Sequence, residues 1–261
     1  MSYNNPSATG PNANNAQPMS TGTLDHVTGN AYELPNKGAP VRIHLTPIAP
    51  PSALGLAAFA SSTFITGTWL ASWYGNATTP LILWPFILTF GGLGQFTAGM
   101  WAFKARDTLG SVFHSMWGSF WIALGLFLAV VGTDVTQGVD RYAYNDAWAI
   151  WMVPLAVLSY ILTAASVYRD MVWATTAFTV ATGSLLGVLG WFIHEAAPLK
   201  LMGYFWIASS VLSTYRVALY VIHEASPDRD LLPRFTHNRH RQHIDKGYHH
   251  GYNEPGVIAG Y

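Results

Sequence analysis

Long apolar runs alternate with short polar connections between Ser52 and Ala225. Each run is near the ~20 residues that a helix needs to cross about 30 Å of hydrocarbon. We therefore predict an all-α, polytopic membrane protein whose helices form a bundle. The six predicted transmembrane helices span residues 52–74, 81–103, 109–132, 147–168, 171–193 and 201–223.

Two polar segments flank the apolar region. Residues 1–45 are rich in Asn, Pro, Gly, Ser and Thr, and residues 226–261 contain prolines and a histidine-rich run. Segments of this composition bury too little apolar surface to order themselves. The sequence thus predicts disordered tails on both sides of a six-helix transmembrane domain at 46–225, the second tail carrying His and Arg residues.

Polar residues recur at helical spacing within the apolar runs. Steps of three and four place each set on one helix face. A polar side chain in hydrocarbon is costly unless it faces protein or a water-filled cavity, so close helix packing and a polar pathway both explain the pattern. The sets are Phe59, Ser62, Thr63 and Thr66; Gly91, Gln95 and Gly99; Gly110, His114, Trp117, Gly118 and Trp121; Thr175, Thr179 and Thr182; and Ser209, Ser213, Arg216 and Tyr220.

Three of these residues bear most directly on whether the pattern reflects helix packing or a polar pathway. The Gln95 amide has two donors and an acceptor to satisfy, which a helix contact or a pore can provide. Arg216 either snorkels to the interface, forms an internal pair or supplies a positive charge that attracts anions. His114 either packs as a hydrogen-bonded residue or relays protons.

The composition strengthens the membrane assignment. Hydrophobic residues make up 51% of the chain and charged residues only 10%, against about 25% charged residues in soluble domains. The formal net charge is zero, so no general attraction to nucleic acid is implied. The chain has no cysteine, which excludes disulfides and thiolate metal sites. The histidine run at 235–250 is irregularly spaced, so a basic tail near anionic lipid is favoured over a metal site.

Membrane enzymes and cofactor proteins fit the sequence poorly. An intramembrane serine protease would need a G-x-S-G motif, which is absent. A haem carrier would need facing histidine pairs, but His114 and His223 are expected toward one side and His194 toward the other. A retinal protein would need a buried lysine in a seventh helix, and Lys200 is expected in a loop. We therefore predict no catalytic residue, no cofactor and no metal site.

Basic residues gather on one side of the predicted helices, and Lys and Arg favour the cytoplasmic side. Both tails are therefore predicted to be cytoplasmic. The basic residues on that side are Lys37, Arg42, Lys104, Arg106, Arg169 and those that follow the sixth helix, whereas the opposite connections carry only Arg141 and Lys200.

Two motifs are similar to those of the acetate uptake transporter family, which includes the fungal acetate/ammonia transporter proteins and the bacterial succinate–acetate permease. PSALGLAAF at 51–59 resembles the first-helix signature N-P-A-P-L-G-L-x-x-F and retains Pro51, Leu54, Gly55 and Leu56. GGLGQFTAGMWAFKARDTLGSVFHSMWGSFW at 91–121 resembles the block G-G-x-x-Q-x-x-A-G-x-x-x-F…T-x-G-x-x-x-x-x-x-[YW]-G-x-F-W. On these motifs the chain is identified as a divergent fungal member.

The resemblance implies a six-helix protomer of the plasma membrane that assembles as a homohexamer, with a pore through each protomer. The family moves small monocarboxylates such as acetate, in some members succinate, generally with protons, and ammonium transport has been proposed for parts of it. Its narrowest point is aromatic and aliphatic, which corresponds to Phe59, Trp117 and Phe178 here, with Val180 as the alternative to Phe178. Gln95 and Thr63 are expected to contact the carboxylate.

Two departures from the family pattern bear on function. Pro50-Pro51-Ser52-Ala53 stands where the family has Asn-Pro-Ala-Pro, and Trp117 stands where it has Tyr. A bulkier, drier constriction should disfavour dicarboxylates. The altered first motif keeps a second interpretation open, in which the protein does not transport but senses acid or the carbon source through its tails.

Overall fold

The computed structural model describes residues 48–131, 141–226, 231–233 and 235. Six helical spans there are long and apolar enough to cross a membrane, as predicted. The expectations for residues 1–45 and for the histidine run lie outside the described residues, apart from Phe235. The elements are α2 (Pro51–Leu70), α3 (Pro80–Phe86), the π-helical segment η3 (Ile87–Gly94), α4 (Gln95–Lys104), α5 (Thr108–Val131), α6 (Arg141–Val167), α7 (Met171–Phe192) and α8 (Ala196–Ala225).

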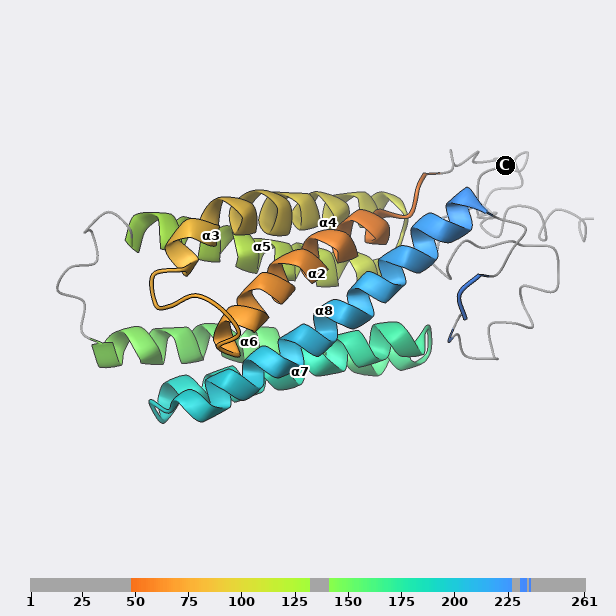
Figure 1. The fold of residues 1–261 in the computed structure, drawn as a ribbon. Coiled ribbons are helices and arrows are strands. Elements are labelled where there is room, and N and C mark those ends of the chain that lie inside the picture. The colour runs from red at the N-terminus through yellow and green to blue at the C-terminus, as the bar shows by residue number, and fades with distance from the viewer. Residues whose placement is uncertain (1–47, 132–140, 227–230, 234, 236–261) are drawn as a thin grey trace, which may run out of the picture. The chain divides into compact units, whose positions relative to one another are not determined.

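The spans run up and down the bundle, so that the beginning of α2 and the end of α8 lie at the same end (Figure 1). We call this the tail-side end; it also holds the α4–α5 and α6–α7 turns. The opposite, far end holds the α2–α3 and α7–α8 connections. At the tail-side end the chain folds back after α8, because Met171 donates its backbone N–H to the Phe235 carbonyl at 3.0 Å.

Local signals explain most helix boundaries. Pro51 occupies the first turn of α2, where its missing N–H costs nothing. Ser72 adopts a left-handed φ of 61°, so α2 ends at Leu70, before the predicted 74. The last helix, α8, begins at Ala196 rather than at the predicted residue 201. Lys200 therefore lies within a helix, not in the loop where we expected it.

The second span is not a uniform α-helix. Pro85 cannot donate a backbone hydrogen bond, and directly after it η3 runs for eight residues as a π-helix. π-helical turns are rare and occur frequently at functional sites. This segment ends at Gly94, so Gln95 is the first residue of the α-helix that follows.

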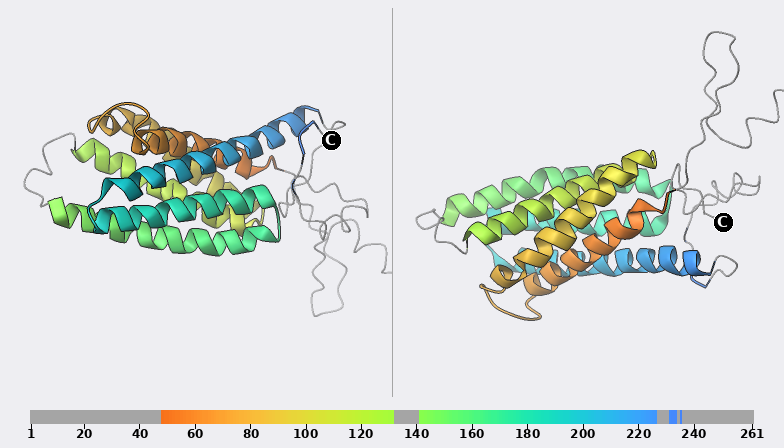
Figure 2. Two further views of the ribbon diagram at one scale, coloured as in Figure 1. Left: turned by 60° about the horizontal axis from the view of Figure 1, so that its bottom comes forward. Right: turned by 90° about the horizontal axis from the view of Figure 1, so that it is seen from above.

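The helices form two groups that meet along a single long seam. One group is α2, η3, α4 and α5, and the other is α6, α7 and α8; α2 and α8 pack along each other, whereas α5 touches α6 only slightly. The two further views show α2 beside α8 over much of their length (Figure 2). The space between α5 and the second group is filled by the large side chains described below.

Glycine permits the closest helix contact within the first group. A Cβ on Gly118 would lie 2.5 Å from the backbone nitrogen of Phe96, so Gly118→Ala should force α4 and α5 apart. Overpacking of this kind costs about 1–3 kcal/mol of stability. Gly94→Ala is the matched control, since its Cβ would have its nearest neighbour at 3.6 Å. Thermal unfolding in detergent should show a lowered midpoint for Gly118→Ala only; equal midpoints would contradict the close contact.

Candidate functional site

Buried aromatic rings cross the middle of the helix bundle in continuous contact. Phe59 meets Phe113 and Trp117 edge-on, with ring centroids 5.1 and 5.7 Å apart. Trp117 in turn meets Trp206 at 5.8 Å. We name this the aromatic cluster; its members are Phe59, Phe113, Trp117, Phe120, Trp121, Trp173 and Trp206, all at most 3% exposed. Because four helices contribute rings, the cluster closes the axis of the bundle.

The structure brings two of the three expected constriction residues together and places the third elsewhere. Phe59 and Trp117 touch, but Phe178 is 48% exposed and lies against Tyr160, with ring centroids 6.2 Å apart. The reason is helical phase: α7 turns inward at Trp173 and Val180, both buried, and Phe178 lies on another face. Phe178 therefore does not join the aromatic cluster. The ring that α7 contributes to it is that of the larger Trp173.

Several buried polar atoms within the spans have no hydrogen-bond partner among the described residues. Neither amide atom of Gln95 and no hydroxyl of Ser62 or Thr63 has a hydrogen-bond partner among the described residues, although all three side chains are fully buried. Such a group costs about 1–3 kcal/mol and is rare in proteins, which is why it calls for a role. The described residues with such atoms include Ser52, Ser62, Thr63, Thr66, Gln95, His114, Ser115, Trp121, Trp173, Trp206 and Ser213.

The threonine stripe of α7 belongs to packing. Thr175, Thr179 and Thr182 each donate to a carbonyl four residues earlier, at 2.7–2.9 Å. Their side chains are exposed or half-buried on the outer side of the bundle. The inward threonine is Thr176, whose carbonyl accepts from the Ser209 hydroxyl at 2.9 Å. The stripe thus does not share the axis with Gln95.

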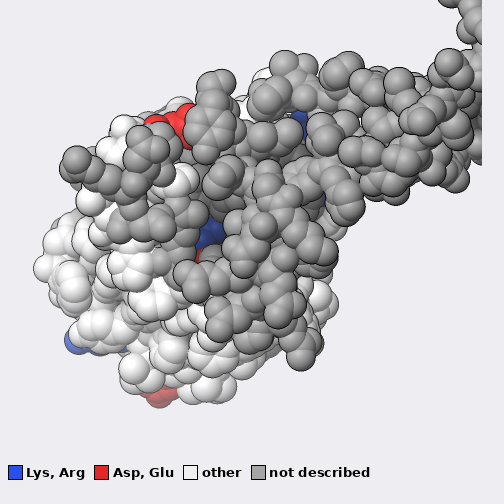
Figure 3. Space-filling view, turned by 90° about the vertical axis from the view of Figure 1, so that its right-hand side faces the viewer, with Lys and Arg blue, Asp and Glu red and all other residues white. Residues whose placement is uncertain are grey.

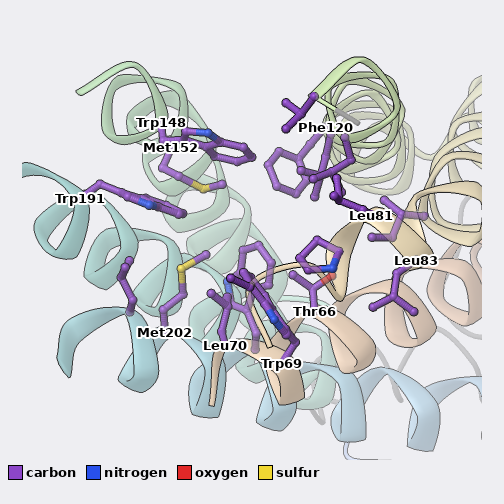
Figure 4. Close-up of a pocket in the computed structure, with 18 of the residues that line it drawn as sticks. Thr66, Trp69, Leu70, Leu81, Leu83, Phe120, Trp148, Met152, Trp191 and Met202 are labelled. Atoms are coloured by element: carbon purple, nitrogen blue, oxygen red, sulfur yellow. The ribbon is translucent and has the colours of Figure 1, made fainter. Parts of the chain in front are cut away.

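A cavity of about 320 Å³ opens on the far side of the aromatic cluster. Figure 4 shows Trp148, Met152 and Trp191 facing Thr66 across it, with Phe120 beside them. Its lining comes from every span and contains no acidic or basic side chain. This chamber is within the size range of small-molecule sites, and its apolar walls favour an uncharged occupant.

Two buried ion pairs lie at the tail-side end. Arg169 donates from its two terminal guanidinium nitrogens to the two carboxylate oxygens of Asp107, at 2.7 and 2.9 Å. The next residue, Asp170, pairs with Arg216, which also donates to the Tyr220 hydroxyl at 3.2 Å. Of the three alternatives for Arg216, the internal pair is therefore the one observed. In Figure 3, which looks onto this end, basic and acidic atoms show in small patches.

Each aspartate also caps a helix. Asp107 accepts from the Gly110 backbone N–H at 3.0 Å, and Asp170 from that of Trp173 at 2.9 Å. Burial works against ionisation of Asp107, but the Arg169 guanidinium and the Gly110 N–H outweigh it and hold the pKa of this carboxyl below its usual range. The α6–α7 turn thereby joins the α4–α5 turn on one side to α8 on the other.

His114 lies between the aromatic cluster and the ion pairs. Its ring meets Phe113 at 5.4 Å and Trp173 at 5.7 Å, and neither ring nitrogen has a hydrogen-bond partner in the described part of the chain. Gly55 makes room for it, because a Cβ there would lie 2.5 Å from the imidazole. This contact explains the glycine of the first motif; Leu54 next to it is 45% exposed and Leu56 is buried.

Sequence reasoning missed Trp173, Trp206 and the two aspartates. A signal existed for each. Asp107 and Asp170 directly precede helices, the position that favours a capping carboxylate. Trp206 lies three residues before Ser209 and so belongs to the polar face of α8. For metals, the described residues hold no group of three or more His, Asp or Glu side chains that could bind an ion.

The fold and its buried axis define an integral membrane protein of six helices. Residues 35–226 match the GPR1/FUN34/yaaH family, and the chain belongs to this family, as the motifs at 51–59 and 91–121 indicated.

Similar proteins include accumulation of dyads protein 2 of Saccharomyces cerevisiae, 24% identical over 68% of this chain and 62% of that protein. Acetate permease A of Emericella nidulans is 26% identical over 54% of this chain and 51% of its own length. This chain thus spans about half to three-fifths of the length of these relatives. The structure of the bacterial acetate channel SatP superposes with a TM-score of 0.64 over 72% of this chain and 99% of that one, at 20% identity, so the two share a fold.

Removal of one partner from a buried ion pair leaves a charge without compensation. Arg169→Ala should therefore destabilise the protein by about 3–5 kcal/mol, whereas Arg169→Ala combined with Asp107→Asn should recover part of the loss. Because the pKa of Asp107 is lowered by folding, its contribution is full above about pH 5 and is lost as the pH falls below about 4. Unfolding midpoints against pH measure both; a single variant as stable as the double would contradict the pairing.

Proposed function

We propose that the protein conducts small monocarboxylates, acetate first among them, across a membrane through a path within each protomer. Family membership and the similarity to an acetate permease and an acetate channel support transport rather than catalysis. The observation that carries the proposal is the line of buried, unpartnered polar atoms that accompanies the aromatic cluster through the apolar spans.

The chemistry of these atoms suits a carboxylate. Indole N–H groups donate and do not accept, and the Gln95 amide and Thr63 hydroxyl can both donate. Trp121, Trp173 and Trp206 each have an N–H without a partner among the described residues. A carboxylate accepts such bonds, whereas ammonium needs acceptors. Because a similar protein, 23% identical, is named ammonia transport outward protein 2, ammonium is a second substrate to compare with acetate in transport assays.

The aromatic cluster sets the protonation state of the cargo. A carboxylate that leaves water for a ring-lined passage without a counter-charge pays a large desolvation penalty, and its neutral acid does not. Passage with a proton therefore lowers the barrier. His114 lies next to the cluster and is the side chain best placed to exchange that proton with the cargo, in line with the neutral or charged states that histidine adopts.

We further propose the surroundings of the protomer from indirect arguments. The tail-side end carries Lys104 and Arg106 and is taken as cytoplasmic because basic residues favour that side. Both tails would then be cytoplasmic, in the plasma membrane and in a homohexamer, as the family resemblance implies. The alternative of a non-transporting acid or carbon-source sensor differs in one respect: purified protein in liposomes would move no acetate.

Gln95→Ala should weaken acetate transport. Loss of a hydrogen bond to a charged group costs about 1.5–3 kcal/mol, which corresponds to about a tenfold or greater rise in the half-saturating acetate concentration. Phe178→Ala is the control: this side chain lies outside the cluster and should leave uptake unchanged. Uptake of labelled acetate into proteoliposomes is the measurement. Equal rates for wild type and Gln95→Ala would remove Gln95 from the path, and a wild type without uptake would favour the sensor.

Trp117→Tyr should widen selectivity. Trp117 contacts Phe59 and Trp206 and donates its indole N–H to Ser159 at 3.2 Å, so a smaller ring leaves space in the cluster. We expect succinate uptake to rise relative to acetate uptake by several-fold. Ser159→Ala removes the same hydrogen bond without changing the ring and serves as the control. A ratio that stays fixed in Trp117→Tyr would mean that this position does not limit substrate size.

A further inference from the structure

The aromatic cluster ends at the second ion pair. Its tail-side member Trp173 meets Phe113 with ring centroids 5.0 Å apart. The backbone N–H of the same Trp173 bonds Asp170, and Asp170 pairs with Arg216. An unbroken series of contacts thus leads from the closed middle of the protomer to a buried guanidinium.

The two members of this pair differ in what they need. Arg216 is 3% exposed and stays charged at any relevant pH, so it requires an anion or strong acceptors close by. Asp170 has a second stabilising contact, the amino end of α7 through the Trp173 N–H at 2.9 Å. Its carboxylate therefore keeps a partner when the guanidinium turns to another anion. The pair is suited to an exchange in which only the arginine changes its ligand.

Two further donors belong to residues that are linked to this ion pair by sequence spacing or by a backbone hydrogen bond. Ser213 lies three residues before Arg216, on the same face of α8, and its hydroxyl is fully buried without a partner in the described chain. The indole N–H of Trp173 is likewise unpartnered and 1% exposed. A carboxylate offers about four lone-pair positions, enough to accept from a guanidinium and from either of these groups. Asp170 occupies only part of this set of donors.

We propose that Arg216 is a carboxylate-binding residue of the path and that Asp170 pairs with its guanidinium while no cargo is bound. A permeating carboxylate takes over the guanidinium from Asp170, which remains at the amino end of α7, and Asp170 returns when the cargo leaves. This inference rests on the proposed function and adds a binding site on the tail-side of the aromatic cluster. Each carboxylate has a partner at every stage, so no charge is left buried alone. The site selects anionic cargo over neutral or cationic molecules.

Asp170→Asn separates this role from a structural one. Asparagine retains the helix-capping ability of the aspartate but removes its charge, so Arg216 becomes available to added anions. The equilibrium dissociation constant for labelled acetate at pH 7.5, measured on purified protein, should fall about tenfold. Transport should slow because the cargo is released less readily. Asp107→Asn is the comparison variant: it makes the same change at the cap of α5 but frees Arg169 instead of Arg216, so a tightening confined to Asp170→Asn assigns the binding to Arg216.

The outcomes are distinct. Tighter acetate binding in Asp170→Asn, but not in Asp107→Asn, supports the site. Equal affinity in both variants, with wild-type uptake intact, overturns it and leaves the proposed function standing; a wild type that neither binds nor transports acetate overturns the proposed function itself. If Asp170→Asn does not fold, Asp170→Asn combined with Arg216→Gln provides a neutral, hydrogen-bonding pair. That variant should bind acetate at least about tenfold more weakly than the wild type, and unchanged affinity would again contradict the site.

Discussion

A polar atom in the hydrocarbon of a membrane needs a partner from protein or from water, because lipid offers none. Most hydroxyls in the described spans find a partner nearby, as Thr175 and Ser184 do by donating to a backbone carbonyl of their own helix. The exceptions gather where α2, α4, α5, α7 and α8 converge, and Gln95 is the most costly of them. Their occurrence in the buried interior of the spans, rather than the total number of polar residues, is the feature that helix packing alone does not explain.

The same constraint explains why the charges lie where they do. Four buried ionised side chains at one end of the bundle would be untenable singly, but each aspartate has both a guanidinium and a helix amino end. Buried ion pairs contribute little net stability compared with apolar packing. Their value here is geometric: Arg169 and Asp170, adjacent in sequence, hold the α4–α5 turn and α8 to a common point. The tail-side end of the bundle is thereby shaped by electrostatics, while its middle is shaped by rings.

Much of this architecture could be predicted from the sequence. The apolar runs predicted six spans because length and composition alone decide whether a helix can cross a bilayer. The start of α8 was predicted too late, with Lys200 in a loop, although Pro198 is tolerated in the first turn of the helix that begins at Ala196. The ion pairs were out of reach, since Asp107 and Arg169 are 62 residues apart and only the fold brings them together. Phe178 shows a subtler limit: a motif locates a helix, but an error of two residues turns a side chain from the axis to the surface.

The aromatic cluster is closed, and the contact between α5 and α6 beside it is slight. A small acid cannot pass between rings that touch at 5–6 Å between centroids unless some of them move. Rings in edge-to-face contact can rotate with modest loss, because each such pair contributes only about 0.5–1.5 kcal/mol beyond burial. Trp117 and Phe120 are carried by α5, which packs tightly on η3 and α4 but only slightly on α6. For the proposed function, a displacement of α5 relative to the second group is therefore the movement that this packing opposes least. The π-helical segment η3 packs on α5 within the first group.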